Sequence, residues 1–232
     1  DVAALTTKQV SALTTDQVRK GLTTDQVVAL TTAQVSSLTT DQVIAITTDQ
    51  VKAMETRDVA SLKTSQVAAL TTDQTKKGLT TDQVAALTTS QVGALTTDQV
   101  SKGLTTDQTV ALTTAQISKL LDTQVKEMST AQIAAIETAD IAKMTNDQVA
   151  ALSTTAVKGM SVDQLSTITT AQLASMTTAQ VSVLTADQLA GLTTAQIVEL
   201  SSTQLASLTS LQVSVLNSDQ LSSIELADMS AL

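Results

Sequence analysis

Large apolar residues recur along the whole chain at spacings that alternate between five and three residues. Leu5 and Val10 open the series, and the same eight-residue unit, or octad, then repeats to the last residue. Three intervals between Leu-type positions are nine residues long instead of eight, and each has a glycine before the next Leu: Gly21, Gly78 and Gly103. A repeat that never loses its register indicates a tandem array, and missing it would misassign the fold.

The spacing excludes a β-strand and a single long helix. A strand keeps its apolar residues on one face only when they lie an even number of positions apart, and five and three are odd. In one unbroken helix, an apolar residue every four positions would drift by roughly 80° per octad, so the stripe would wind around the rod. No straight partner would cover such a stripe.

Each octad instead predicts one short helix that starts with a capping box. The first Thr of each pair is placed as the N-cap and the Gln as N3, so that each side chain pairs with a backbone N–H of the other. The preceding Leu and the Val at N4 form a hydrophobic staple, and the next Leu, at N7, is expected to end the helix of about two turns. The first three predicted caps are Thr6 with Gln9, Thr14 with Gln17, and Thr23 with Gln26.

The exceptions to this pattern carry expectations of their own. Gln fills 24 of 28 slots; the others hold Asp58, Asp140, Ala156 and Asp228. Where the first Thr is replaced, we expect the cap to shift by one residue: Glu55, Lys63, Leu121, Glu137 and Glu225. We expect the three glycines of the nine-residue octads to take positive φ and to absorb the extra residue in a C-terminal turn.

Helices of two turns are not stable alone, because nucleation costs more than they recover. We therefore predict an all-α fold, a superhelical solenoid of short capped helices that is kinked at each Thr pair and runs as one continuous array over residues 1–232. The two residues after each Val are usually small, which would let successive coils approach closely. In stacked coils the Gln column has an alternative role as an amide ladder. The pattern does not give the number of octads per coil.

Composition narrows the possible functions. The chain has no aromatic residue, no Cys, no His and no Pro, so we expect neither an enzyme nor a cofactor or metal site. Adjacent Ser and Lys occur at Ser101–Lys102 and Ser118–Lys119 and are interpreted as solvated side chains. A net charge of −9 argues against nucleic acid as a partner, and no apolar run is long enough to span a membrane.

The two ends of the sequence predict self-association. Val2 and Leu5 at the start, and Met229 and Leu232 at the finish, stay in apolar register without a polar capping repeat. A solenoid with such ends exposes its interior, and an open end that matches an open start forms a head-to-tail contact. Residues 159–232 contain no Lys or Arg, so contacts with the basic part of a neighbouring copy are expected to depend on salt.

The phrase "LTTDQVVAL" at 22–30, repeated with small changes over all 232 residues, resembles the L-T-T-x-Q-V-x-x-L arrays of very large bacterial surface proteins that are described as adhesins. This resemblance implies an extracellular or cell-surface structural role, as a fibre, a filament or an adhesin stalk. A second hypothesis is that the Thr pairs form a surface that binds ice, another solid or a glycan.

Overall fold

A computed structural model describes residues 2–224, and within that range every regular element is helical. Most elements are α-helices of four to six residues, one for each octad. The short 3₁₀ element η1 comes first, and the three elements η2, η3 and η4 are π-helical turns. The predicted all-α array of short capped helices is confirmed.

Contacts along the chain divide it into two compact units, Asp1–Lys119 and Leu120–Leu232. The elements of the first unit are η1 Val2–Ala4, α1 Thr7–Ser11, η2 Gln17–Gly21, α2 Thr24–Val28, α3 Thr32–Ser37, α4 Thr40–Ala45, α5 Thr48–Ala53, α6 Thr56–Ser61, α7 Thr64–Ala69, η3 Gln74–Gly78, α8 Thr81–Ala86, α9 Thr89–Ala94, η4 Gln99–Gly103, α10 Thr106–Val110 and α11 Thr114–Ile117. Those of the second unit are α12 Asp122–Glu127, α13 Thr130–Ala135, α14 Thr138–Ile141, α15 Asn146–Ala151, α16 Thr154–Gly159, α17 Val162–Thr167, α18 Thr170–Ser175, α19 Thr178–Ser182, α20 Ala186–Ala190, α21 Thr194–Val198, α22 Ser202–Leu205, α23 Ser210–Ser214 and α24 Ser218–Ser223.

Two consecutive extended residues separate many of these helices. Leu38 ends α3 at φ −57° and ψ 142°, and Thr39 caps α4 at φ −76° and ψ 160°. The helices are therefore shorter than the two turns expected. The Leu-type residue that was expected to be the last helical residue instead has an extended backbone and lies outside the helix. An extended pair is incompatible with a continuous helix, so the chain changes direction at each junction.

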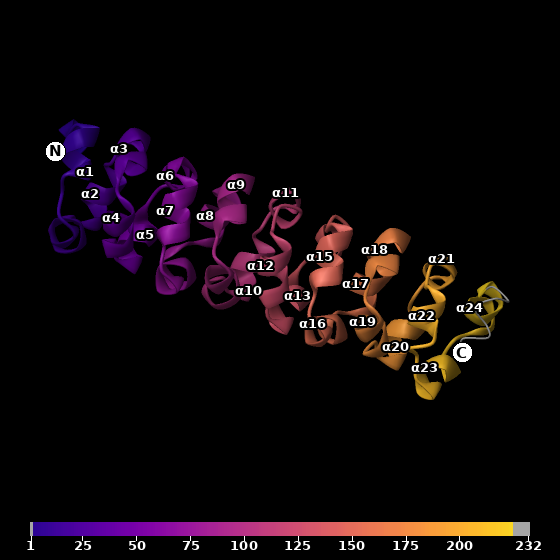
Figure 1. Cartoon of the computed structure of the whole chain (residues 1–232). Coiled ribbons are helices and arrows are strands. Elements are labelled where there is room, and N and C mark those ends of the chain that lie inside the picture. The colour runs from indigo at the N-terminus through magenta and orange to yellow at the C-terminus, as the bar shows by residue number, and fades with distance from the viewer. Residues whose placement is uncertain (1, 225–232) are drawn as a thin grey trace. The chain divides into compact units, whose positions relative to one another are not determined.

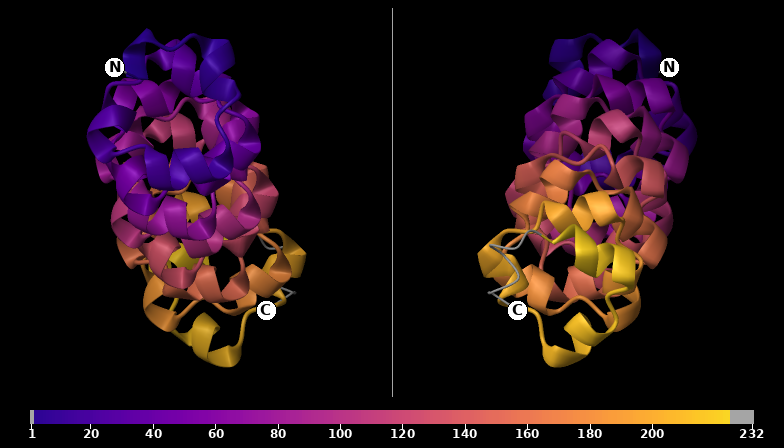
Figure 2. Two further views of the ribbon diagram at one scale, coloured as in Figure 1. Left: turned by 90° about the vertical axis from the view of Figure 1, so that its left-hand side faces the viewer. Right: turned by 90° about the vertical axis from the view of Figure 1, so that its right-hand side faces the viewer.

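Successive coils stack within each unit. In the first unit α3 packs on α6 and α4 on α7, so a helix contacts the third helix after it (Figure 1); in the second unit α13 packs on α16 in the same way. Gln42 of α4 donates to the carbonyls of Val10, in α1, and Leu13, just after α1. Helix α1 lies four elements before α4 in the chain. One coil therefore contains between three and four octads. Figure 2 (left) shows the first coil of the first unit facing the viewer.

The interior of each unit is formed by the Val and Leu columns. Val35 is fully buried and Leu38 is 5% exposed, and the same burial recurs from octad to octad. Each coil contributes only small and medium aliphatic side chains, which pack against the coils before and after it. The core is thus a narrow column, and it needs none of the large aromatic side chains that a globular core commonly uses.

The nine-residue octads absorb their extra residue differently from the expectation. No glycine has a positive φ within the described residues. Instead a π-turn forms, in which the N–H of Leu79 donates to the carbonyl of Gln74 at 2.9 Å, five residues earlier. The expectation of a left-handed glycine was wrong, because widening the last turn accommodates the residue without a change in helical hand.

Close packing explains the glycines. A Cβ added to Gly78 would lie 3.0 Å from Cβ of Val51 in the previous coil, and one added to Gly103 would lie 3.0 Å from Cβ of Thr75. Gly21 has no such neighbour, since its nearest side-chain atom is Cβ of Gln17 at 3.9 Å. The bulge of each π-turn pushes the backbone towards the previous coil, and glycine leaves room for that approach.

Candidate functional site

The cap residues form reciprocal pairs at the start of most helices. Oγ1 of Thr6 accepts from the backbone N–H of Gln9 at 3.2 Å, and Oε1 of Gln9 accepts from the N–H of Thr6 at 2.8 Å. Thr14 with Gln17 and Thr23 with Gln26 make the same two hydrogen bonds at 2.8–3.2 Å. Each pair satisfies two backbone donors that a helix N-terminus would otherwise leave free.

Where the first Thr is replaced, the cap does not shift. Glu55 and Lys63 stay in the extended N-cap conformation, and their helices begin at the next residue as elsewhere. Oε1 of Gln66 still accepts from the N–H of Lys63 at 2.6 Å. The expected shift was wrong at the described positions. At Lys63 the Gln66 side chain holds the N-cap backbone, whereas at Glu55 the N-cap conformation persists although Asp58 in the Gln slot makes no such bond. Glu225 lies outside the described residues.

The amide nitrogen of the same Gln connects one coil to the next. Nε2 of Gln91 donates to the carbonyl of Leu62 at 2.7 Å and to that of Val59 at 3.1 Å, both in the previous coil. The Gln91 side chain is 2% exposed, and its Oε1 accepts from Thr88 N–H at 2.7 Å. The acceptors are backbone carbonyls, so the amide ladder proposed from the sequence does not form between Gln side chains.

This bridging role recurs through both units. In the first unit Gln74 reaches Ile46, and in the second Gln180 reaches Leu152, with N–O distances of 2.6 and 2.7 Å. These carbonyls belong to residues at the C-terminal end of a helix, so no N–H group of that helix donates to them. The sequence signal for the bridge was the strictness of the Gln slot, which capping by itself does not require.

Hydroxyl groups add a second set of hydrogen bonds between coils. Ser37 Oγ lies 2.7 Å from the Gln34 carbonyl of its own helix and 3.3 Å from the Thr7 carbonyl of the previous coil, so its hydrogen is shared between them. Ser175 Oγ is shared in the same way between Gln172 and Asn146, at 2.6 and 3.0 Å. Both serines come just before the Leu-type position, where the sequence keeps residues small. Small polar residues at this position therefore let two backbones approach and also satisfy a carbonyl.

The first coil presents its Gln residues to solvent. Gln9 and Gln17 are exposed and Gln26 is partly exposed, whereas Gln34 and the Gln residues of later coils are buried. Val2 and Leu5 are partly exposed, and their carbonyls accept from Nε2 of Gln34 at 3.1 and 2.6 Å. Met229 and Leu232, the other two residues expected at assembly ends, lie outside the described residues.

Asp58 is the one buried side chain of the described residues whose oxygens have no hydrogen-bond partner. It occupies a Gln slot, is 1% exposed, and lies 4.0 Å from Nε of Arg57, which pairs with Glu55 at 2.7 Å. Burial raises the pKa of the Asp58 carboxyl above its usual 3.8; the Arg57 charge opposes this rise and the Glu55 charge adds to it.

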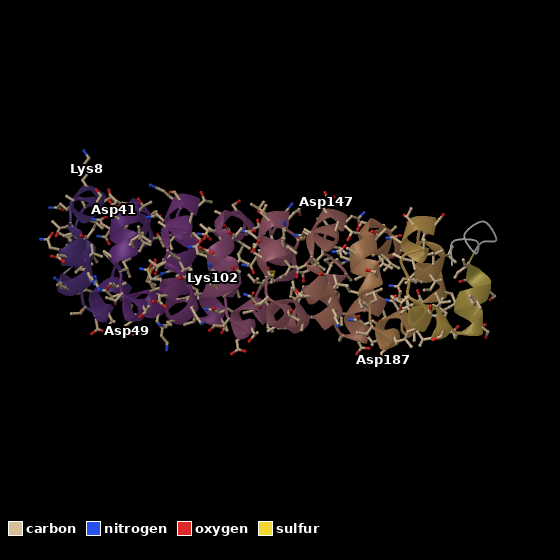
Figure 3. The ribbon with its side chains drawn as sticks, turned by 60° about the horizontal axis from the view of Figure 1, so that its bottom comes forward. Lys8, Asp41, Asp49, Lys102, Asp147 and Asp187 are labelled. Carbon is tan, nitrogen blue, oxygen red and sulfur yellow. The ribbon has the colours of Figure 1, made fainter. Side chains whose placement is uncertain are left out.

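Apart from Asp58 and Asp140, which is 7% exposed, the charged side chains of the described residues lie at the surface. Each nine-residue octad has an Asp–Lys ion pair four residues apart: Asp16–Lys20 at 3.1 Å, Asp73–Lys77 at 3.0 Å and Asp98–Lys102 at 2.7 Å. Figure 3 shows Lys8 pointing away from the ribbon. Such exposed pairs contribute about 0–1 kcal/mol each, so charge is a minor part of the stability.

Within residues 2–224, no three Asp or Glu residues gather into a group that could hold a metal ion. None of the helices in this range combines the length and the apolar character that crossing a bilayer requires.

Comparison with known proteins identifies the repeat. The model of the ALTTAQ repeat family matches residues 1–32, 22–56, 51–89, 77–102, 133–170 and 159–194. These matches together cover residues 1–102 and 133–194, which is more than half of the chain. No curated protein matches the sequence.

Proposed function

The chain belongs to the ALTTAQ repeat family, and we propose that its function is structural: it builds an extracellular bacterial fibre, filament or adhesin stalk by stacking identical coils along one axis. Regular repetition suits spacing and assembly, since each repeat contacts only its neighbours and length can vary freely. In this proposal the protein is not an enzyme, and its partner is a further copy of itself.

The observation that carries the proposal is the Gln bridge between successive coils, which has the same form from coil to coil. Gln42, for example, accepts from the N–H of Thr39 through Oε1 and donates through Nε2 to the carbonyl of Leu13 in the preceding coil. Gln9, Gln17 and Gln26 use Oε1 in the same way, and a preceding coil, of the same array or of another copy, would supply the carbonyls for their Nε2 atoms.

The stacking surface of one copy therefore complements that of the next with the same hydrogen bonds that hold the coils together. Because such a contact is heterologous and its rotation need not close, repeated addition gives a filament. The partly exposed Val2 and Leu5 belong to the same face and would contribute apolar area to the contact. Association would thus continue the solenoid instead of creating a new type of interface.

Sedimentation at micromolar concentration and low salt tests this proposal. We expect the mass of the full chain to increase with protein concentration. The triple variant Gln9→Glu, Gln17→Glu and Gln26→Glu keeps an oxygen for each N-cap N–H but replaces the donor with a carboxylate, so it should stay monomeric.

The matched control is Thr7→Glu, Thr15→Glu and Thr24→Glu, which places the same charge on exposed N1 positions of the same coil. An acidic residue in the first turn is favourable to a helix, so these variants should fold and still associate. A wild-type chain that stays a monodisperse monomer would refute the assembly proposal, and so would equal association by both triple variants.

A surface that binds ice, another solid or a glycan stays a prediction from the sequence. The first Thr of most pairs uses its hydroxyl in the cap, which leaves the second Thr for contact with a ligand. Thermal hysteresis of the purified chain distinguishes this hypothesis from a purely structural role, because only an ice-binding surface would produce it.

A further inference from the structure

The register of the Gln bridges identifies the groups that face Asp58. Gln50 donates to the carbonyl of Leu22 at 2.6 Å, and Gln66 donates to that of Leu38 at 2.8 Å. Asp58 occupies the slot midway between these two Gln residues, so the carbonyl in register with it is that of Leu30. The Leu30 carbonyl therefore needs a hydrogen-bond donor from the Asp58 slot, as the Leu22 and Leu38 carbonyls receive one from Gln50 and Gln66.

An ionised Asp58 has no donor to offer. Its side chain is also shorter than that of Gln by one methylene, about 1.5 Å, so it stops short of the carbonyl. Both carboxyl oxygens are buried without a hydrogen-bond partner, and Arg57 is held by Glu55. The charged form therefore places a carboxylate close to carbonyl lone pairs in a site that excludes water, which is unfavourable.

We propose that Asp58 makes the junction between octad 55–62 and the preceding coil depend on pH. When Asp58 is neutral, its hydroxyl donates to the Leu30 carbonyl after a small inward shift of α6. When Asp58 loses its proton to solvent, that donor disappears and the buried charge favours opening. The junction tightens in acid and loosens as pH rises.

The surroundings favour a proton over a metal ion as the species that fills this site. Helix α3, which packs on α6, has no charged residue, and α8, which also packs on α6, has only the exposed Asp82. Lys52 and Lys63 flank α6 along the chain and are exposed. The guanidinium of Arg57, 4.0 Å away, would repel a cation.

The sequence repeats this acidic pair. All three Asp residues in Gln slots follow a Glu in the N-cap slot, as Glu55–Asp58, Glu137–Asp140 and Glu225–Asp228. Gln is retained when the N-cap residue is Lys63 or Leu121, so loss of the Thr does not by itself bring Asp into the slot. Asp140 is likewise buried, at 7% exposed, which makes the pair a distinct variant of the octad.

The direction of the effect follows from linkage. Because burial raises the pKa of Asp58 in the folded chain above 3.8, the folded state binds more protons than the unfolded state between those two pKa values. The stabilisation is complete below pH 3.8 and is lost as pH rises through the folded-state pKa. It stays absent at higher pH.

Amide hydrogen exchange of the full chain tests the proposal between pH 4 and 8. The variant Asp58→Asn has nearly the same shape and no charge at any pH, so exchange in α6 is compared between the two proteins at each pH. We expect the α6 amides of the wild type to lose protection relative to the variant as pH rises, by about tenfold for each unit by which the pKa is raised. Helix α18 of the second unit should show no difference.

Two further variants and one salt complete the test. Asp58→Gln restores the bridging donor and should protect α6 more than Asp58→Asn at every pH, whereas Asp82→Asn should leave the wild-type profile unchanged. Parallel profiles of wild type and Asp58→Asn would overturn the proposal. Equal protection by Gln and Asn would do the same. Recovery of wild-type protection by calcium chloride at neutral pH would identify a metal site instead and also overturn it.

Discussion

At the scale of the residue, the Gln side chain joins two kinds of structure. Its oxygen completes the cap of its own helix and its nitrogen holds the preceding coil, as Gln91 does with Thr88 and Leu62. Glu would supply the oxygen but no donor, and Asn would be too short to reach the carbonyl. One amide thus links the folding of a helix to its packing, which explains why the slot varies so little.

Replacing Gln91 and Gln9 separately with Ala should distinguish the two roles. Gln91→Ala leaves the Thr88 N–H and the Leu62 carbonyl without partners, whereas the Val59 carbonyl still accepts from the N–H of Leu62. We therefore expect a loss of about 1–3 kcal/mol for each of the two buried groups left unpaired. Gln9→Ala removes only a cap at an exposed position and should cost about 1 kcal/mol. Urea denaturation monitored by circular dichroism measures both, and equal losses would show that the bridge contributes nothing.

At the scale of the element, each helix is stable only because of its neighbours. Helices of four to six residues are far below the length that is stable alone in water. The cap sets where each one starts, and the extended Leu–Thr pair ends it. The π-turns show that an octad tolerates one extra residue, provided that a glycine occupies the position where the backbone approaches the previous coil.

Gly103 and Gly21 provide a matched test of that close approach. In Gly103→Ala the new Cβ would meet Thr75 at 3.0 Å, and we expect a loss of about 1–3 kcal/mol from overpacking. In Gly21→Ala the space is open, and Ala should stabilise the helical turn by about 0.5–1 kcal/mol. Thermal unfolding of dilute monomer compares the two, and similar changes of the same sign would contradict this account of the glycines.

At the scale of the whole molecule, stability is distributed along each unit. Every interior coil is held by hydrogen bonds and apolar contacts from the coils on both sides, while the ion pairs are exposed and weak. In such an array the free energy of opening varies with the number of neighbours that a helix has. Local opening therefore starts where a coil is covered on one side only.

Hydrogen exchange within the first unit should show that the free energy of opening is lower for a helix that is covered on one side than for a helix that is covered on both sides. Helix α7 packs on α4 of the preceding coil and on α9 of the following coil, whereas α1 is covered by α3 and by Gln42 of α4, both later in the chain. We expect α1 amides to exchange at least about tenfold faster than those of α7, equivalent to roughly 1.4 kcal/mol. The measurement uses monomeric protein at low concentration. Uniform protection across α1 and α7 would indicate a single cooperative unit.

The sequence predicted the local structure better than the long-range contacts. The caps of the octads that keep Thr and Gln, and the all-helical repeat, followed from residues such as Thr6 and Gln9, because capping chemistry acts within four residues. The caps at Glu55 and Lys63 did not, since the expected shift by one residue does not occur. The number of octads in a coil did not follow, since it depends on the angle set by extended pairs such as Leu38–Thr39. The hydrogen bond from Gln to the preceding coil and the π-turn at Gly78 were not predicted either, because both depend on contacts with a coil about 28 residues away.

The Gln bridge has a consequence for how such a chain grows and shrinks in evolution. Its acceptor is a backbone carbonyl, which every octad offers irrespective of its side chains, so duplicating or losing a whole octad re-pairs each Gln with a new but equivalent partner. Only positions matched to one particular neighbour, such as Gly103 above Thr75, would be disturbed by the change of register. Unequal recombination between near-identical octads would therefore change the length of the array in steps of eight residues at little cost, except in segments such as those from Val51 to Gly78 and from Thr75 to Gly103.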